Sequence, residues 1–198
     1  MNIEEKIMDE RSKEVKKVNK KFMSDTKSSE ILIVILKAHL YIERELIKAL
    51  TETIIDEKIL KNTTFVQKLE LAKSMGIIDD IGGALNKVNS IRNRYAHDID
   101  YVFDEKIFED LLSTLTKEDK EDFLSEYDHW KKWLYDGDIP EFNFKTQLLL
   151  NNIWFSLCAC RAFAKKAIET RLREKELEVA IKYNGETTVV EKNKNINS

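Results

Sequence analysis

The segment SIRNRYAHD, residues 90–98, holds the side chains best suited to chemistry on a phosphate. Arg92, Asn93 and His97 lie within two turns of a stretch that otherwise has the pattern of an amphipathic helix. Histidine transfers protons near neutral pH, and arginine offers a planar set of donors to phosphate oxygens. Together they could move protons and stabilise developing charge during cleavage of a phosphodiester, without a metal or a cofactor.

The helical positions of these residues argue against a purely solvated charge cluster. An ideal helix has here an apolar arc centred on Val88 and composed of Ala84, Leu85, Val88, Ile91 and Tyr95. Arg92 leaves the helix from inside this arc, whereas Asn93 and His97, four residues apart, share the opposite side. The neighbouring Asp98 could orient His97, or could simply face water.

A second expected helix, residues 30–50, brings two more polar residues toward the site. Its expected inner face consists of Leu32, Leu36, Leu40, Leu46, Ile47 and Leu50. His39 and Glu43, one turn apart, fall in the middle of that face. Because an unpaired buried carboxylate is costly, we expect Glu43 to pair with Arg92 and to fix its guanidinium, with His39 as a hydrogen-bonding neighbour.

Composition indicates an all-α fold, since 198 residues include only five glycines and one proline. This length suits one domain with a sizeable core. Thr64 is a candidate helix cap and Gly76 a candidate helix end. Periodicity predicts helices at about 3–22, 30–50, 53–60, 64–75, 83–97, 104–115, 118–135 and 143–180.

Charge is distributed unevenly along the chain. Residues 11–27 have a net charge of +5 and residues 161–175 of +4, whereas residues 98–141 have fifteen acidic residues against five lysines, a net −10. If the two basic helices lie together, the fold has a basic face for a polyanion. The alternative is an ordinary solvated helix surface of mixed charge. Apolar runs are short or interrupted by polar residues, and no signal peptide is apparent, so we expect a soluble cytoplasmic protein.

The pattern RNRYAH has the form R-N-x-x-x-H and resembles the R-x4–6-H motif of the HEPN superfamily. The stretches AHLYIERELIKAL, FVQKLELAKSMGII and ALNKVNSIRNRYAH also resemble small bacterial HEPN proteins related to the mannitol-operon repressor-like group. Motif-level likeness covers about residues 28–100. The resemblance implies a HEPN-like helical bundle over 28–180, after a charged helix at 1–27 and before a polar, flexible tail at 181–198.

The resemblance further implies a homodimer in which two motifs share one cleft, and metal-independent endoribonuclease activity of the toxin or phage-defence kind. Arg92 and His97 then match the catalytic pair and Asn93 the polar position beside the arginine. RNA would be the substrate, and an antitoxin or other regulatory protein a possible partner. The alternative is a non-catalytic HEPN-type regulator or adaptor that binds a protein partner.

Overall fold

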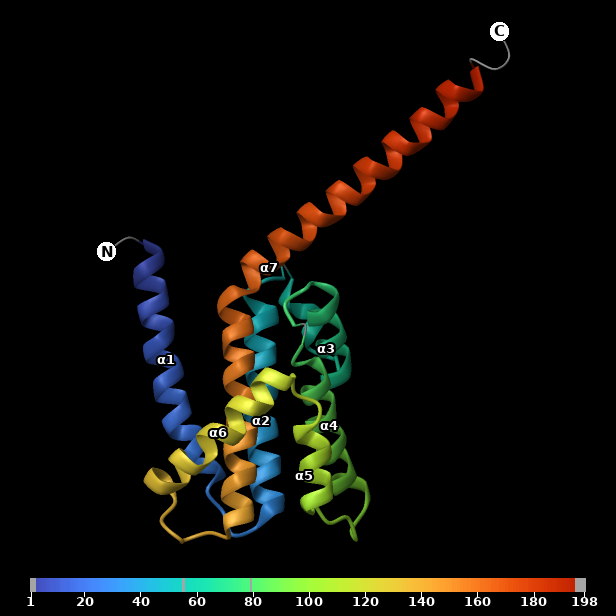
Figure 1. The fold of residues 1–198 in the computed structure, drawn as a ribbon. Coiled ribbons are helices and arrows are strands. Elements are labelled where there is room, and N and C mark those ends of the chain that lie inside the picture. The colour runs from blue at the N-terminus through green and yellow to red at the C-terminus, as the bar shows by residue number, and fades with distance from the viewer. Residues whose placement is uncertain (1–2, 55, 79, 195–198) are drawn as a thin grey trace.

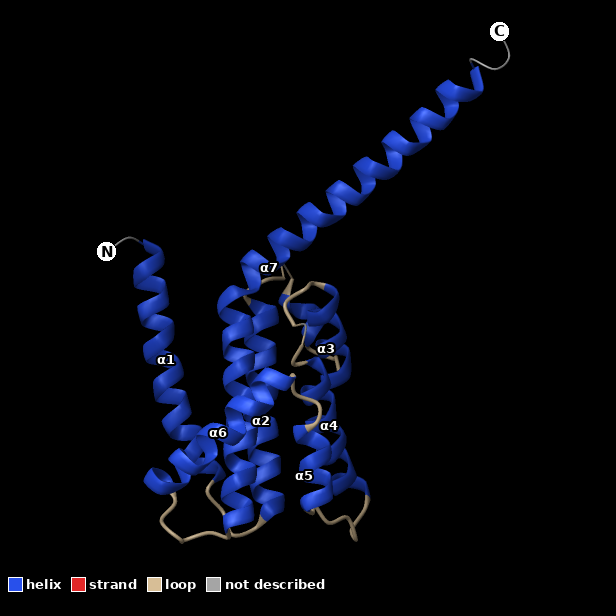
Figure 2. Ribbon diagram, in the orientation of Figure 1, coloured by secondary structure: helices blue, strands red, loops and turns tan. Residues whose placement is uncertain are grey.

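The protein is an all-α bundle with one very long C-terminal helix (Figures 1 and 2). The computed structural model describes residues 3–54, 56–78 and 80–194, and within these ranges it has helices and no strand. No helix in the described ranges is both long and apolar enough to cross a membrane. The elements are α1 (Ile3–Thr26), α2 (Ile31–Thr51), the 3-10 helix η1 (Glu57–Leu60), α3 (Phe65–Ser74), α4 (Gly82–His97), α5 (Glu105–Leu112), α6 (Lys117–Leu134) and α7 (Glu141–Lys194).

The bundle is organised around α2 and α7, which have the most extensive mutual packing of any pair of helices. α1 packs against both of them, α3 and α4 cover another side of α2, and α5 packs on α4. α6 crosses the bundle obliquely and contacts α7 (Figure 1). In this arrangement α2 and α4 run in opposite directions, so the end of α4 lies beside the beginning of α2.

Local signals in the sequence place α3 as expected. The Thr64 side chain accepts a hydrogen bond from the Gln67 backbone, and the Gln67 side chain accepts one from the Thr64 N–H, which completes a capping box. At the other end Gly76 has a φ of 73°, and the Ile77 N–H reaches the Ala72 carbonyl. This Schellman-type ending requires the left-handed backbone that glycine adopts without strain.

The expected inner face of α2 is wrong for its first half. Leu32, Leu36 and Leu40 are 38%, 36% and 64% exposed. The helix instead buries the arc composed of Val34, Ile35, Ala38, Ile42, Leu46, Ala49 and Leu50. Because the first half of α2 is apolar almost all round, its own pattern does not determine the rotation, and packing against the other helices does. An apolar stripe therefore stays on the surface.

α7 is longer than expected and continues to Lys194. The tail expected to be flexible from residue 181 is helical as far as that residue, and residues 195–198 lie outside the described part of the chain. Figure 1 shows the C-terminal half of α7 leaving the bundle as a single projecting helix. The charged helix expected at residues 1–27 is α1, and its contacts with α2 and α7 make it part of the bundle.

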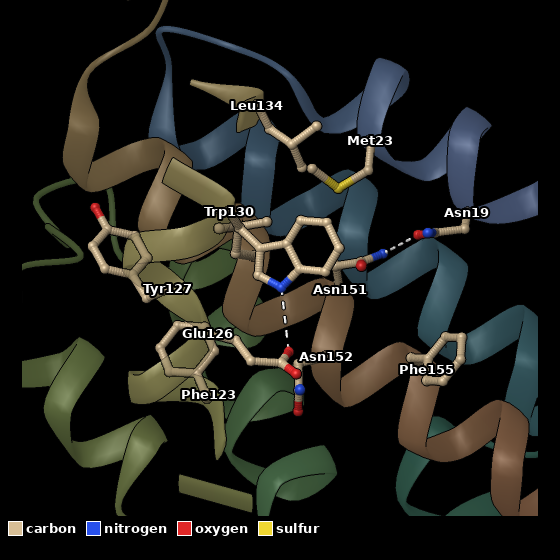
Figure 3. A pocket seen from close by; sticks show the side chains of 11 residues that line it. Asn19, Met23, Phe123, Glu126, Tyr127, Trp130, Leu134, Asn151, Asn152 and Phe155 are labelled. Atoms are coloured by element: carbon tan, nitrogen blue, oxygen red, sulfur yellow. Dashed lines mark hydrogen bonds between the residues drawn. The ribbon is translucent and has the colours of Figure 1, made fainter. Parts of the chain in front are cut away.

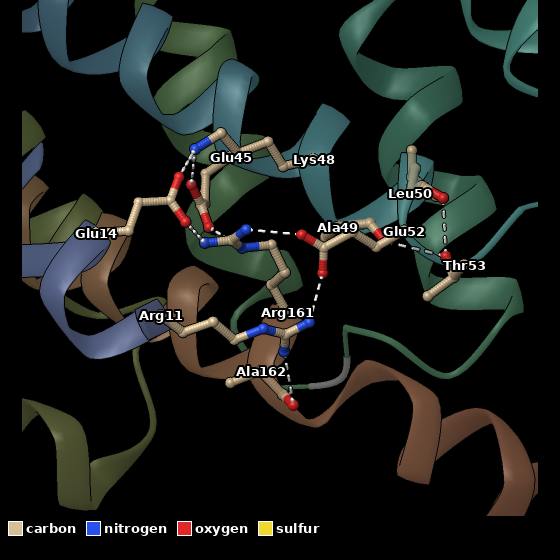
Figure 4. A network of polar contacts seen from close by, with 10 residues as sticks. All are labelled: Arg11, Glu14, Glu45, Lys48, Ala49, Leu50, Glu52, Thr53, Arg161 and Ala162. Carbon is tan, nitrogen blue, oxygen red and sulfur yellow. Dashed lines mark hydrogen bonds and ion pairs between the residues drawn. The ribbon is translucent and has the colours of Figure 1, made fainter. Parts of the chain in front are cut away.

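A charge network whose central pair, Arg161 and Glu45, is buried joins α1, α2 and α7 (Figure 4). The guanidinium of Arg161, only 6% exposed, has Nε 2.5 Å from the Glu45 carboxylate, Nη1 2.8 Å from Glu52 and Nη2 3.3 Å from Glu14. Lys48 and Arg11 complete the network through Glu14 and Glu52. Burial disfavours the charged guanidinium, but the carboxylates outweigh burial and raise the pKa of Arg161.

This network weakens the expected basic face. α1 and α7 do lie together, but Arg11 and Arg161 point into the network and are neutralised there. Lys16, Lys17 and Lys20 remain exposed on α1.

The network also affects the side chain of Cys158. Burial is the main cause that raises the pKa of its thiol, and the nearby Glu45 carboxylate raises it further. Cys158 is therefore a protonated core side chain.

Candidate functional site

The motif occupies the last two turns of α4, where Tyr95 still packs against the core. The expected apolar arc is confirmed, because Ala84, Leu85, Val88 and Ile91 are buried. Arg92, expected inside this arc, is exposed, although the preceding Ile91 is only 3% exposed. His97 is exposed as the last residue of the helix. The site is thus a surface of the molecule.

The expected ion pair between Glu43 and Arg92 is wrong. Glu43 Oε1 accepts a hydrogen bond from Lys68 Nζ at 3.0 Å, and the Lys68 side chain is only 9% exposed. Arg92 Nη1 donates instead to Oδ1 of its neighbour Asn93, at 3.1 Å. With α2 rotated, Glu43 lies at the edge of the buried face, where the α3 lysine reaches it. The polar residue that contacts the arginine is therefore the one inside the motif.

Lys68 is a residue that the sequence reasoning missed, although a signal was present. It lies three residues after Phe65 and one before Leu69, on the apolar face of α3. A lysine at such a position needs a carboxylate on the neighbouring helix, just as Glu43 needs a cation. The two requirements satisfy each other across the α2–α3 contact.

His39 is a buried neighbour of the site. Its Nε2 lies 3.2 Å from Oδ1 of Asn89 on α4, so the neutral ring can donate to that amide, and its ring centroid is 4.9 Å from that of Phe65. Burial lowers the pKa of His39, against smaller raising effects from the Asn89 hydrogen bond and the Glu43 charge. The Arg92 charge lowers it slightly further. His39 thus helps to hold α4 against α2 as a neutral hydrogen-bonding residue, and Asn89 is a second residue that the sequence reasoning missed.

The lowered pKa of His39 predicts how the stability of the fold depends on pH. The unfolded state protonates His39 below about pH 6.5, whereas the folded state does so only at lower pH. The contribution of neutral His39 to the free energy of unfolding is therefore complete above about pH 6.5 and is lost as the pH falls below that value. Urea unfolding between about pH 5 and pH 8 should show a smaller pH dependence for His39→Gln than for the wild type.

The matched control for that measurement is His129→Gln, because His129 is exposed on α6. It should keep the wild-type pH dependence. If the free energy of unfolding depends on pH equally in His39→Gln and in the wild type, His39 titrates at the same pH in the folded and unfolded states. That result would contradict its assignment as a neutral buried residue.

Asn93 and His97 line a shallow hollow on the surface of α4, next to α3. Its other lining residues are Val66, Asn86, Asn89, Ser90, Arg94 and Asp98. The His97 ring makes no hydrogen bond to another described residue. Asp98 does not orient it, because the Asp98 carboxylate accepts the backbone N–H of Asp100 in the turn after the helix. The hollow therefore combines amide, hydroxyl, imidazole and guanidinium groups on an open face. Its guanidinium is that of Arg94, because Arg92 is not among the lining residues.

The apolar stripe of α2 borders the same end of α4. His39 lies opposite Asn89, and the helices are antiparallel, so Arg92 lies at the level of Leu36, one turn earlier on α2. The exposed members of this stripe are Leu32, Ile33, Leu36 and Leu40. An apolar surface of this kind beside a polar site is typical of an interaction face.

Metal ligands are not grouped in the described part of the chain: no three His, Cys, Asp or Glu side chains there could hold an ion together.

A scan against protein-family models finds no match to this chain, and searches of curated proteins and of solved structures find none either. The function is therefore argued from the residues of the site and their arrangement.

Proposed function

We propose that the protein is a metal-independent endoribonuclease of the toxin or phage-defence type, in which Arg92 and His97 act on the scissile phosphate. The observation that carries the proposal is the grouping at the end of α4. Arg92 and Asn93 are consecutive residues whose guanidinium and amide are in contact. His97 lies one turn after Asn93, lines the same hollow and makes no hydrogen bond to another described residue. An unengaged imidazole can exchange protons with a substrate.

The chemistry needs only these groups and the RNA. Removal of the proton from the ribose 2′-OH lets that oxygen attack the adjacent phosphorus, forming a 2′,3′-cyclic phosphate as the bond to the 5′-oxygen breaks. The 5′-oxygen leaves with a proton. His97 transfers protons, and Arg92 stabilises the extra negative charge on the phosphate oxygens. Asn93, bonded to Arg92, is a positioning residue.

The proposal also includes a homodimer formed through the α2 stripe. Two copies that cover their Leu36 and Leu40 side chains would bring both α4 ends into one cleft, because Arg92 lies at the level of Leu36. A two-fold interface uses the same patch on both subunits, and this stripe is apolar enough to serve as its core.

Introducing charge into the stripe should therefore separate the copies. We expect the wild type to have twice the 23.2 kDa chain mass by light scattering, and Leu36→Glu/Leu40→Glu to have the chain mass and to lose RNA cleavage. Leu124→Glu is the control, because Leu124 is 44% exposed on α6 and lies outside the stripe. A wild type that is monomeric at micromolar concentration would contradict the shared cleft.

The direct test is incubation of the purified protein with a panel of single-stranded and structured RNAs. Cleavage should persist in EDTA, leave 2′,3′-cyclic phosphate or 3′-phosphate ends, and fail when the scissile nucleotide lacks its 2′-OH. DNA should stay intact. Expression of the protein alone should slow cell growth. Binding of RNA without cleavage across the panel would contradict the nuclease and favour the regulator or adaptor.

A further inference from the structure

A cavity of about 340 Å³ lies between α1, α6 and α7, and the proposed nuclease site does not include any of its residues. Its volume falls at the lower end of the range for small-molecule sites, and like those sites it combines apolar walls with a few polar groups. Four aromatic side chains line it: Phe123, Tyr127, Trp130 and Phe155. Figure 3 shows the Trp130 indole between Phe123 and Tyr127 on one side and Phe155 on the other.

Two of the rings facing this cavity are accessible to a ligand. Trp130 is 41% exposed and Phe155 is 54% exposed, so neither ring is covered by the core. Aromatic faces carry negative potential and attract organic cations, most strongly at tryptophan. The apolar floor, completed by Met23 and Leu148, suits the carbon body of such a ligand.

The charge of the lining has one sign. Glu126 is its only ionisable carboxylate, and no lysine or arginine is among the lining residues. α1 has exposed lysines, but it contributes only Asn19 and Met23 to the cavity. The Glu126 carboxylate accepts a hydrogen bond from Trp130 Nε1 at 3.2 Å, which places the carboxylate beside the indole (Figure 3). Among the lining residues a phosphate or carboxylate ligand would find no cationic partner, whereas a cation would find both a counter-charge and a π face. Lys145 Nζ lies 5.8 Å from the centroid of the Tyr127 ring, but Lys145 is not a lining residue.

Three amides add hydrogen-bonding capacity. Asn151 Nδ2 donates to Asn19 Oδ1 at 2.6 Å, which leaves the Asn151 oxygen available as an acceptor. The side-chain amide of Asn152 has no hydrogen-bond partner among the described residues. Amide oxygens accept from the N–H groups of a guanidinium or an ammonium.

From these observations we propose that this cavity, which we call the α6 pocket, binds a small organic cation with an apolar body, such as an alkylguanidinium or alkylammonium. The cation lies against Trp130 and pairs with Glu126, while its carbon chain covers the apolar floor. The inference is independent of the proposed nuclease activity, and its test does not use RNA.

The test compares three probes of similar length: butylguanidinium, neutral pentanamide and anionic pentanoate. Each is titrated by calorimetry and by tryptophan fluorescence, in a buffer free of other organic cations. Butylguanidinium should bind saturably in about the millimolar range and change the fluorescence, pentanamide should bind at least about fivefold more weakly, and pentanoate should not bind. Trp130→Phe should remove the fluorescence response, because Trp154 is buried in the core and Trp133, 68% exposed on α6, is not a lining residue.

Variants of α6 separate a specific site from general attraction to an acidic helix. Glu126→Gln should weaken butylguanidinium binding at least about fivefold and leave pentanamide binding unchanged. Asp128→Asn, exposed on the same helix but outside the lining, should bind all probes as the wild type does. The proposal would be overturned if Glu126→Gln and Asp128→Asn weakened butylguanidinium binding equally, if the three probes bound equally, or if butylguanidinium did not bind.

Discussion

Replacing His97 with alanine is expected to abolish detectable RNA cleavage while leaving the fold intact. His97 is exposed and makes no hydrogen bond within the described part of the chain, so its removal costs the bundle no hydrogen bond. Loss of a general acid or base typically lowers the rate about 10²–10⁴-fold. The measurement is the initial rate of cleavage of a labelled RNA, with circular dichroism and light scattering to check fold and mass.

Arg92→Ala should have a comparable effect, because loss of a preorganised donor to the transition state typically costs about 10²–10³-fold. Arg92 is also exposed, and its described hydrogen bond goes to Asn93 rather than to a buried carboxylate, so the variant should remain folded. Asn93→Ala should give an intermediate loss, since it frees the guanidinium without removing it.

The matched controls are His129→Ala and Arg173→Ala, which remove an exposed histidine on α6 and an exposed arginine on α7. Both should cleave RNA like the wild type, and their expression should slow growth equally. If His97→Ala and Arg92→Ala cleave as fast as these controls, the end of α4 is not the catalytic site.

The end of α4 could be placed from the sequence because its apolar residues are confined to one arc. Polar side chains on the rest of the helix leave a single favourable rotation, and the structure has that rotation. Thr64 and Gly76 act at the same local level, through bonds to residues three to five positions away. Such signals need no knowledge of the neighbouring helices.

The partners of buried charges could not be placed in this way. Glu43 and Glu45 lie two residues apart on α2, about 200° around the helix, and the rotation of α2 decides which of them reaches the core. The structure buries Glu45 against Arg161 and leaves Glu43 at the edge with Lys68. The sequence does indicate that Arg161 is unusual, because it is the only charged residue between Lys145 and Lys165. It does not indicate the partners of Arg161, which are more than 100 residues away along the chain.

Arg161 gives the largest expected effect on stability. Its removal as Arg161→Ala leaves the Glu45 carboxylate, 4% exposed, without its closest counter-charge. Breaking a buried ion pair on one side typically costs about 3–5 kcal/mol in the free energy of unfolding. Alanine favours the helix, so the loss would not arise from helix propensity in α7. Urea unfolding followed by circular dichroism measures it.

The comparison that tests this interpretation is Arg171→Ala on the exposed part of α7. Arg171 lies 3.8 Å from Glu174, and both side chains are more than half exposed, so its loss should cost at most about 0.5 kcal/mol. If the free energy of unfolding of Arg161→Ala is within about 1 kcal/mol of that of the wild type, solvent or a side-chain rearrangement neutralises Glu45.

The network should also respond unequally to removal of its members. Arg161 serves the carboxylates of Glu45, Glu52 and Glu14, whereas Glu45 is only one of three partners of the guanidinium. Glu45→Gln therefore leaves the Arg161 guanidinium paired with Glu52 and Glu14. It should lower the free energy of unfolding by less than Arg161→Ala does. The double variant Glu45→Gln/Arg161→Ala should be more stable than Arg161→Ala alone, because it removes the uncompensated buried charge. A double variant that is less stable than Arg161→Ala would show that packing of the arginine side chain, and not its charge, holds α1, α2 and α7 together.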